Sequence, residues 1–159
     1  MSVLGNGRST AVVGVVALSG VACLALPAGL AAAPSRTADA GPMKEHVTLK
    51  LVKRTGSSKF EHDGRATGTV RGPVVSKIAL THSVVLKGTV TISSSRGKLR
   101  LSIDGRARSI AVKTRFNGTA TVVAGTGRYA HAKGKGTFAG VIDRSNWNAT
   151  IDASGSMTF

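Results

Sequence analysis

The chain has 159 residues, a length that fits one folded domain and excludes a multidomain enzyme. Its hydrophobic fraction of 42% is too high for a wholly disordered chain, and its 20 glycines do not follow a collagen-like period. The 22 Lys and Arg residues outnumber seven Asp and Glu residues, and the net charge of +15 favours encounter with anionic partners of any kind.

Residues 1–33 are predicted to be a secretory signal peptide. Residues 11–30 carry no charge, the only charged residue before them is Arg8, and a run of small residues follows. This layout is typical of export, with cleavage between residues 31 and 40. The apolar run is also long enough for an uncleaved membrane anchor, which is the second interpretation. In that case the protein would contact a membrane only through this segment.

Residues 34–43 are predicted to be a flexible lead into a domain that spans residues 44–159. The only cysteine, Cys23, lies in the signal segment, so the mature chain has no thiol and no disulfide. Small exported domains of eukaryotes are usually rich in disulfides, and their absence is more typical of bacterial export. We therefore expect a bacterial protein that is secreted or held at the cell envelope.

Alternating apolar and polar residues predict short antiparallel strands throughout residues 44–159. The alternation is clear at 46–51, 74–80, 84–92, 98–103 and 147–159, and weaker at 65–71, 107–114, 118–124 and 136–142. No long segment has a helical period. About eight strands at spacings of about ten residues indicate a sandwich or a closed barrel.

Glycines on the apolar face of these strands favour the barrel. Glycine at an inward position lets a strongly coiled strand bend around a narrow interior. The sequence therefore predicts an all-β fold, a small closed antiparallel barrel of about eight strands preceded by a signal-peptide helix. The glycines that share the apolar parity are Gly68, Gly88, Gly118, Gly136, Gly140 and Gly155.

The segment 122–134 reads Val-Val-Ala-Gly-Thr-Gly-Arg-Tyr-Ala-His-Ala-Lys-Gly. It resembles the signature of the allene oxide cyclase and dirigent barrel superfamily, in the form G-T-G-basic-aromatic-x-x-Ala-x-Gly. Residues 65–70, 116–120 and 136–140 also look like exported bacterial members of that superfamily. The resemblance covers residues 44–159 and implies an eight-stranded antiparallel barrel in which the glycine motif bridges two neighbouring strands.

The motif residues are Gly125, Gly127, Tyr129 and Gly134. We expect Gly125 and Gly127 to take positive φ where the chain turns, and Tyr129 to plug one end of the barrel. The plant enzymes of the superfamily use acidic and aromatic pocket residues that do not align with this chain. The resemblance therefore implies a fold and carries over no catalytic residue.

Metal and cofactor sites are not predicted. The histidines are His46, His62, His82 and His131, and none has a close spacing to other ligand residues except in Glu61-His62-Asp63, where adjacent side chains diverge. The lysine of Lys133-Gly134 is not followed by Ser or Thr, so the glycine-rich segment does not match a phosphate-binding loop.

Residues 96–115 hold seven basic residues and only Asp104 to oppose them. Asp104-Gly105 is a signal for a two-residue hairpin turn, which would place Arg106 and Arg108 on the strand face that carries the apolar residues. Because a buried unpaired charge is costly, we expect these arginines at the barrel mouth, in a protruding hairpin tip or at a bulge.

At the mouth, Arg106 and Arg108 would bind an anionic small molecule or an anionic polymer of the cell envelope. Basic residues without an aromatic stacking platform predict no specific recognition of nucleic acid. The sequence does not predict an oligomeric state.

The sequence thus predicts an exported β-barrel that serves as a non-catalytic binding or structural module at the cell envelope or outside the cell. The alternative is an isomerase or cyclase, of the allene oxide cyclase or dirigent type, that acts on a small organic molecule in the barrel lumen. A lumen carboxylate with a raised pKa would favour the enzyme.

Overall fold

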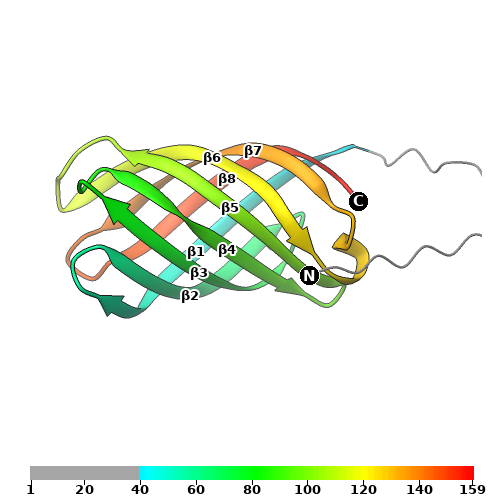
Figure 1. The fold of residues 1–159 in the computed structure, drawn as a ribbon, viewed down its shortest axis with the longest axis horizontal. Coiled ribbons are helices and arrows are strands. Elements are labelled where there is room, and N and C mark those ends of the chain that lie inside the picture. Colours follow the sequence, from blue (N-terminus) through cyan, green and yellow to red (C-terminus); the bar gives the residue numbers. More distant parts are fainter. Residues whose placement is uncertain (1–39) are drawn as a thin grey trace, which may run out of the picture. The chain divides into compact units, whose positions relative to one another are not determined.

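A computed structural model describes residues 40–159, which form a closed barrel of eight antiparallel strands (Figure 1). The strands follow one another around the barrel in chain order, and the last strand pairs with the first. The predicted signal peptide and most of the predicted lead lie outside the described residues. The strands are Gly41–Thr55 (β1), Lys59–Gly68 (β2), Gly72–Thr81 (β3), Val85–Ser94 (β4), Gly97–Ala107 (β5), Lys113–Gly125 (β6), Lys133–Asp143 (β7) and Asn148–Thr158 (β8).

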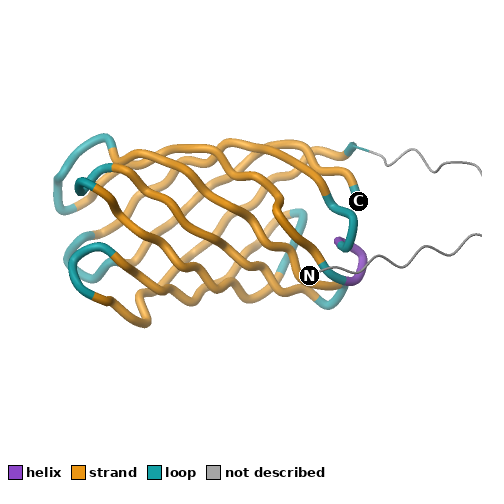
Figure 2. Tube along the Cα trace, viewed as in Figure 1, coloured by secondary structure: helices purple, strands orange, loops and turns teal. Residues whose placement is uncertain are grey.

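The predicted closed antiparallel barrel is confirmed. Its loops gather at the two ends, and a single 3-10 turn, η1 (Gly127–Tyr129), joins β6 to β7 (Figure 2). The strands alternate between buried and exposed residues as the sequence predicts, so one face of each lines the lumen and the other faces solvent. Within residues 40–159, no helix has the length and apolar character needed to cross a membrane.

Three details of the strand prediction are wrong. β1 begins at Gly41, so the last residues of the predicted lead belong to a strand. The strand predicted at 107–114 is the loop between β5 and β6 for most of its length. The hairpin turn predicted at Asp104-Gly105 lies inside β5, where Gly105 pairs with Gly118 of β6.

Gly105 does not form a turn but makes room for the packing of a phenyl ring. A Cβ atom on Gly105 or on Gly118 would come within 2.9 Å or 2.8 Å of the Phe138 ring, and one on Gly140 within 2.7 Å of the Phe116 ring. Both rings are buried, and they meet edge to face with their centroids 6.1 Å apart. The glycines therefore leave the space that two phenyl rings of β6 and β7 fill across the lumen.

The end of the barrel near η1 is closed by Tyr129. Its side chain is 4% exposed, and its ring packs edge to face against Phe159 with the centroids 5.8 Å apart. Gly127 takes a φ of 60°, as expected. Gly125 does not take positive φ: it is needed because a Cβ there would collide with the backbone carbonyl of Tyr129. Gly134 pairs with Met157 of β8.

Replacement of Gly127 by valine tests this closure. A β-branched side chain is strained at positive φ, and its Cβ would lie 2.5 Å from the carbonyl oxygen of Arg96. We expect Gly127→Val to lower the free energy of unfolding by at least about 1 kcal/mol in urea denaturation. Ala124→Val, on the exposed face of β6, is the matched control and should change it by less than about 0.5 kcal/mol. An equal effect of both variants would contradict a conformational requirement at Gly127.

Candidate functional site at the barrel mouth

The end of the barrel opposite η1 holds a pocket of about 220 Å³, here called the mouth pocket. Its inner part is formed by lumen-facing side chains near the strand ends, and its rim by polar side chains of the loops. The inner residues include Leu80, Leu86, Phe116 and Ile142, and the rim residues include Ser57, His82, Ser83, Arg144 and Trp147.

Strained backbone gathers at this pocket. Within residues 40–159, the non-glycine residues with positive φ are His82, Ser83 and Trp147, at 50°, 61° and 61°, and all three line the mouth pocket. His82 and Ser83 belong to the three-residue turn between β3 and β4, and asparagine and glycine are the residues that usually take such positive φ angles. Because such conformations persist mainly where the surroundings enforce them, their concentration marks the mouth as a candidate functional site.

Trp147 is held between aromatic and basic side chains. Its ring stacks on Phe60 with the centroids 4.3 Å apart, and the guanidinium carbons of Arg54 and Arg144 lie 5.0 Å and 5.3 Å from its centroid. The loop that carries Trp147 is braced at its start by Asp143, whose carboxylate accepts hydrogen bonds from the backbone and hydroxyl of Ser145. These hydrogen bonds lower the pKa of Asp143.

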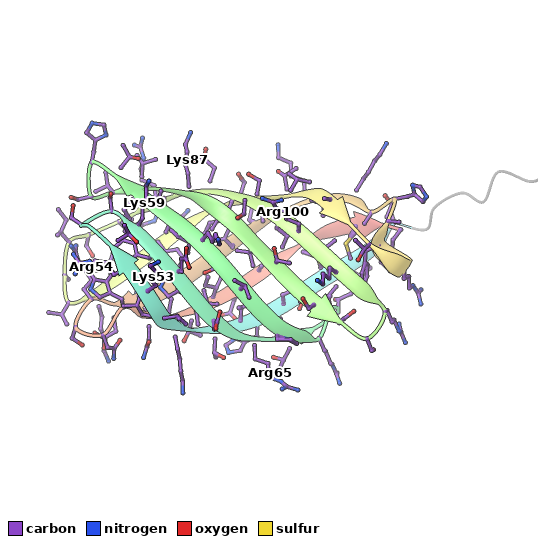
Figure 3. The ribbon with its side chains drawn as sticks, turned by 60° about the horizontal axis from the view of Figure 1, so that its bottom comes forward. Lys53, Arg54, Lys59, Arg65, Lys87 and Arg100 are labelled. Atoms are coloured by element: carbon purple, nitrogen blue, oxygen red, sulfur yellow. The ribbon has the colours of Figure 1, made fainter. Side chains whose placement is uncertain are left out.

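A β-bulge between Leu51 and Lys53 brings Arg54 to the mouth. The bulge shifts the register of β1 against β2, so Arg54 pairs with the lumen-facing Phe60. Figure 3 shows Arg54 at the mouth end of the barrel, with Lys53 and Lys59 near the same end. Arg54 does not follow the alternation of β1, so the sequence pattern does not predict it as a mouth residue. The adjacent apolar residues Leu51 and Val52, of which Val52 is 62% exposed, are the signal that could have revealed the bulge.

Arg106 and Arg108 do not line the mouth pocket. β5 continues through Gly105, so Arg106 takes the outward parity and pairs with Asn117. Arg108 follows the end of β5 on the exposed surface, and its Nε donates a hydrogen bond of 3.1 Å to the Asn117 side-chain oxygen. The expectation of an inward parity for these arginines is therefore wrong, since it depended on a turn at Asp104-Gly105.

The arginines at the mouth have no acidic partner among the described residues. Neither Arg54 nor Arg144 lies within 4.0 Å of a carboxylate there. Arg54 donates one hydrogen bond, from Nε to the carbonyl of Gly56, which leaves its terminal nitrogens available. Two uncompensated guanidinium groups close to one indole ring suit an anion with a flat apolar part.

A buried polar pair supports Trp147 from within the barrel. The Nε2–H of His62 donates to the carbonyl of Trp147 at 3.0 Å, and the hydroxyl of Ser76 donates to Nδ1 of His62 at 3.3 Å. Burial lowers the pKa of His62, although the Trp147 carbonyl opposes the shift. Because His62 is 1% exposed and Ser76 fully buried, this pair stabilises the mouth and is not placed to attack a substrate.

Phe116 and Phe138 separate the mouth pocket from an inner cavity. Phe116 lines the pocket, whereas Phe138 lines an enclosed space of about 40 Å³ deeper in the lumen. The lumen is thus mostly packed shut, and the inner space has room for little more than water.

Glu45 is the polar group of the inner cavity. It is 4% exposed, its Oε1 accepts a hydrogen bond of 2.6 Å from the backbone N–H of Val70, and its Oε2 has no partner. Burial raises the pKa of Glu45, and the hydrogen bonds from the backbone of Val70 and Thr69 oppose the shift. Its parity with Val47 and Leu49 in the sequence could have revealed that it faces the lumen.

Histidine and carboxylate side chains do not gather elsewhere in the described part of the chain. Across residues 40–159, no group of three or more His, Cys, Asp or Glu residues is arranged to hold a metal ion. His46 instead pairs with Asp152 on the outer wall, with 2.6 Å between Nδ1 and Oδ1.

Comparisons with protein-family models, with curated proteins and with solved structures gave no match for this chain.

Glu45→Gln should change how stability depends on pH. Since the folded-state pKa of Glu45 is raised, its contribution to stability is complete below the unfolded pKa of about 4.5 and is lost as pH rises through the folded pKa. Glutamine keeps the acceptor for Val70 and removes the buried charge. We expect Glu45→Gln to exceed the wild type at pH 8 by about 1 kcal/mol, with the difference disappearing near pH 4.

Thermal unfolding across this pH range measures the effect. Glu61→Gln, which removes a half-exposed carboxylate paired with Lys77, is the control and should not reproduce the pH-dependent gain. A wild type that becomes more stable than Glu45→Gln as pH rises would contradict the assignment of an unfavourable buried charge.

Proposed function

We propose that the protein is an exported, non-catalytic binding module that takes a small organic anion in the mouth pocket. The observation that carries the proposal is the pair of arginines without acidic partners around Trp147, at the pocket where the strained residues gather. The arginines would hold the acidic group, and the apolar inner residues would hold the rest of the ligand.

The size of the pocket favours a small ligand. Its volume of about 220 Å³ is below the 300–1,000 Å³ typical of pockets for drug-sized molecules. The groups at the rim are hydroxyls, one imidazole and the guanidinium of Arg144, which are suited to orienting an anion. The buried His62 and Ser76 lie behind Trp147 and do not line the pocket.

We also propose that the chain is an exported bacterial member of the allene oxide cyclase and dirigent superfamily. Support comes from the eight-stranded barrel in chain order, and from Gly127 and Tyr129, which turn the chain between β6 and β7 and close the barrel end. Both features agree with what the resemblance of residues 122–134 implies.

Export is the part of this proposal that rests on the sequence alone. If residues 1–33 are a signal peptide, N-terminal sequencing of secreted protein should begin between Ala32 and Gly41. Recovery only of membrane-bound chain that starts near Met1 would contradict cleavage and favour the anchored form.

Calorimetric titration with naphthalenesulfonate tests the mouth site. We expect one molecule to bind per chain, more tightly than the neutral naphthalenemethanol. Arg54→Gln and Arg144→Gln should each weaken binding of the acid about tenfold, because each removes a charge-assisted hydrogen bond donor beside Trp147.

Arg65→Gln and Arg106→Gln are the controls, since they remove the same charge from the outer wall. They should weaken binding by less than about twofold, because exposed charges act through a high dielectric. Equal losses from mouth and wall variants would indicate general electrostatic attraction. Equal affinity for the acid and the alcohol would also overturn an anion site.

The second candidate function is an isomerase or cyclase, and Glu45 favours it as a lumen carboxyl with a raised pKa and a free oxygen atom. The inner cavity of about 40 Å³ opposes it, because this space is too small for an organic substrate. Recovery of a bound acid chemically unchanged supports the binding module. Formation of an isomer by the wild type, and not by Glu45→Gln, would support the enzyme.

A further inference from the structure

The outward face of β5 carries a row of basic side chains. The outward residues of the strand are Lys98, Arg100, Ser102, Asp104 and Arg106, which alternate with lumen-facing residues, and Arg108 follows the strand end. The four basic residues, Lys98, Arg100, Arg106 and Arg108, are exposed. Outward neighbours in a strand lie about 6.8 Å apart, so the row from Lys98 to Arg106 extends for about 27 Å. These four residues are here called the β5 row.

The β5 row has little negative charge around it. Asp104 is the only acidic residue in β3–β6, and its Oδ2 lies 3.3 Å from Nζ of Lys87 on the neighbouring strand. Among the described residues, none of the four lies within 4.0 Å of a carboxylate. Outward-facing acids elsewhere on the wall belong to β2, β7 and β8: Glu61, Asp63, Asp143 and Asp152.

Two open grooves adjoin the row, one near each end. The groove of about 430 Å³ is lined by Lys98 and Arg100 together with the hydroxyl-bearing Thr89, Thr91 and Thr126. The groove of about 550 Å³ is lined by Arg106, Arg108 and Asn117, and also by Asp104. Figure 3 shows Lys87 and Arg100 along the same side of the barrel. Each groove therefore places basic side chains next to hydrogen-bonding side chains.

We propose that this wall binds a linear, flexible polyanion, laid along β5 so that its acidic groups meet Lys98 and Arg100 near one end and Arg106 and Arg108 near the other. Cations spread over about 27 Å match a chain of charges better than a single small anion. The only aromatic residue in β3–β6 is Phe116, which faces the lumen, so the wall offers no stacking surface for nucleic-acid bases. The partner class is thus an acidic polymer of phosphates or carboxylates.

This surface is separate from the mouth pocket. Binding to a polymer through the wall would leave the mouth open, so the two sites would be occupied independently. A barrel held on an anionic polymer of the cell envelope could then present its mouth to small acids.

The test compares two variants with the same net charge. Lys98→Gln, Arg100→Gln and Arg106→Gln together remove the row, and Lys44→Gln, Lys50→Gln and Lys135→Gln together remove three exposed lysines from β1 and β7. The probe is long-chain inorganic polyphosphate at physiological salt, with polygalacturonate as the carboxylate arm. We expect the row variant to lose at least about tenfold in affinity for one or both, and the control less than about threefold.

Tripolyphosphate separates a polymer surface from a single anion site. The wild type should bind it far more weakly than the long chain, because short chains engage one or two cations at a time. Equal losses from the two triple variants, or equal affinity for tripolyphosphate and the long chain, would overturn the proposal. Unchanged naphthalenesulfonate binding by the row variant shows that it is folded and distinguishes failure at the wall from failure at the mouth.

Discussion

The packing of two phenyl rings against glycines determines what this barrel can hold. Phe138 lies over Gly105 and Gly118, Phe116 lies over Gly140, and the two rings meet edge to face. A Cβ atom at any of these glycines would collide with one of the rings. Because the two rings fill the lumen between them, they divide it into a mouth pocket and an inner cavity. The division is the physical reason to favour a binding module over an enzyme that works in the lumen.

The mouth combines strain with several compensating contacts. Left-handed backbone at Trp147 is unfavourable by about 1–3 kcal/mol, and stacking on Phe60 and the hydrogen bond from His62 are placed to offset it. This arrangement holds an indole ring close to Arg54 and Arg144 before any ligand arrives. Preorganisation of this kind reduces the entropy that a small ligand must overcome on binding. Preorganisation of a binding site therefore explains both the strained loop and the position of the two arginines.

Much of the fold could be predicted from local patterns, whereas the candidate site could not. Alternation gave the strand faces, and glycines on the apolar parity pointed to a closed barrel. The failures depended on contacts between strands. Gly105 looked like part of a turn because its true partner, Phe138, comes from another strand. Arg54 was missed because a bulge in β1 changed its parity. Glu45 was readable as a lumen residue, but its unpaired oxygen atom depends on packing from several strands.

The division of the lumen is tested most directly by NMR of isoleucine methyl groups during titration with naphthalenesulfonate. Ile142 lines the mouth pocket, whereas Ile92, Ile103 and Ile151 line the inner cavity behind Phe138. We predict that the methyl signal of Ile142 and the indole N–H signal of Trp147 shift and saturate together, while the methyl signals of the three inner isoleucines stay unchanged. Shifts of the inner isoleucines at the same ligand concentration, with Ile142 unmoved, would contradict it.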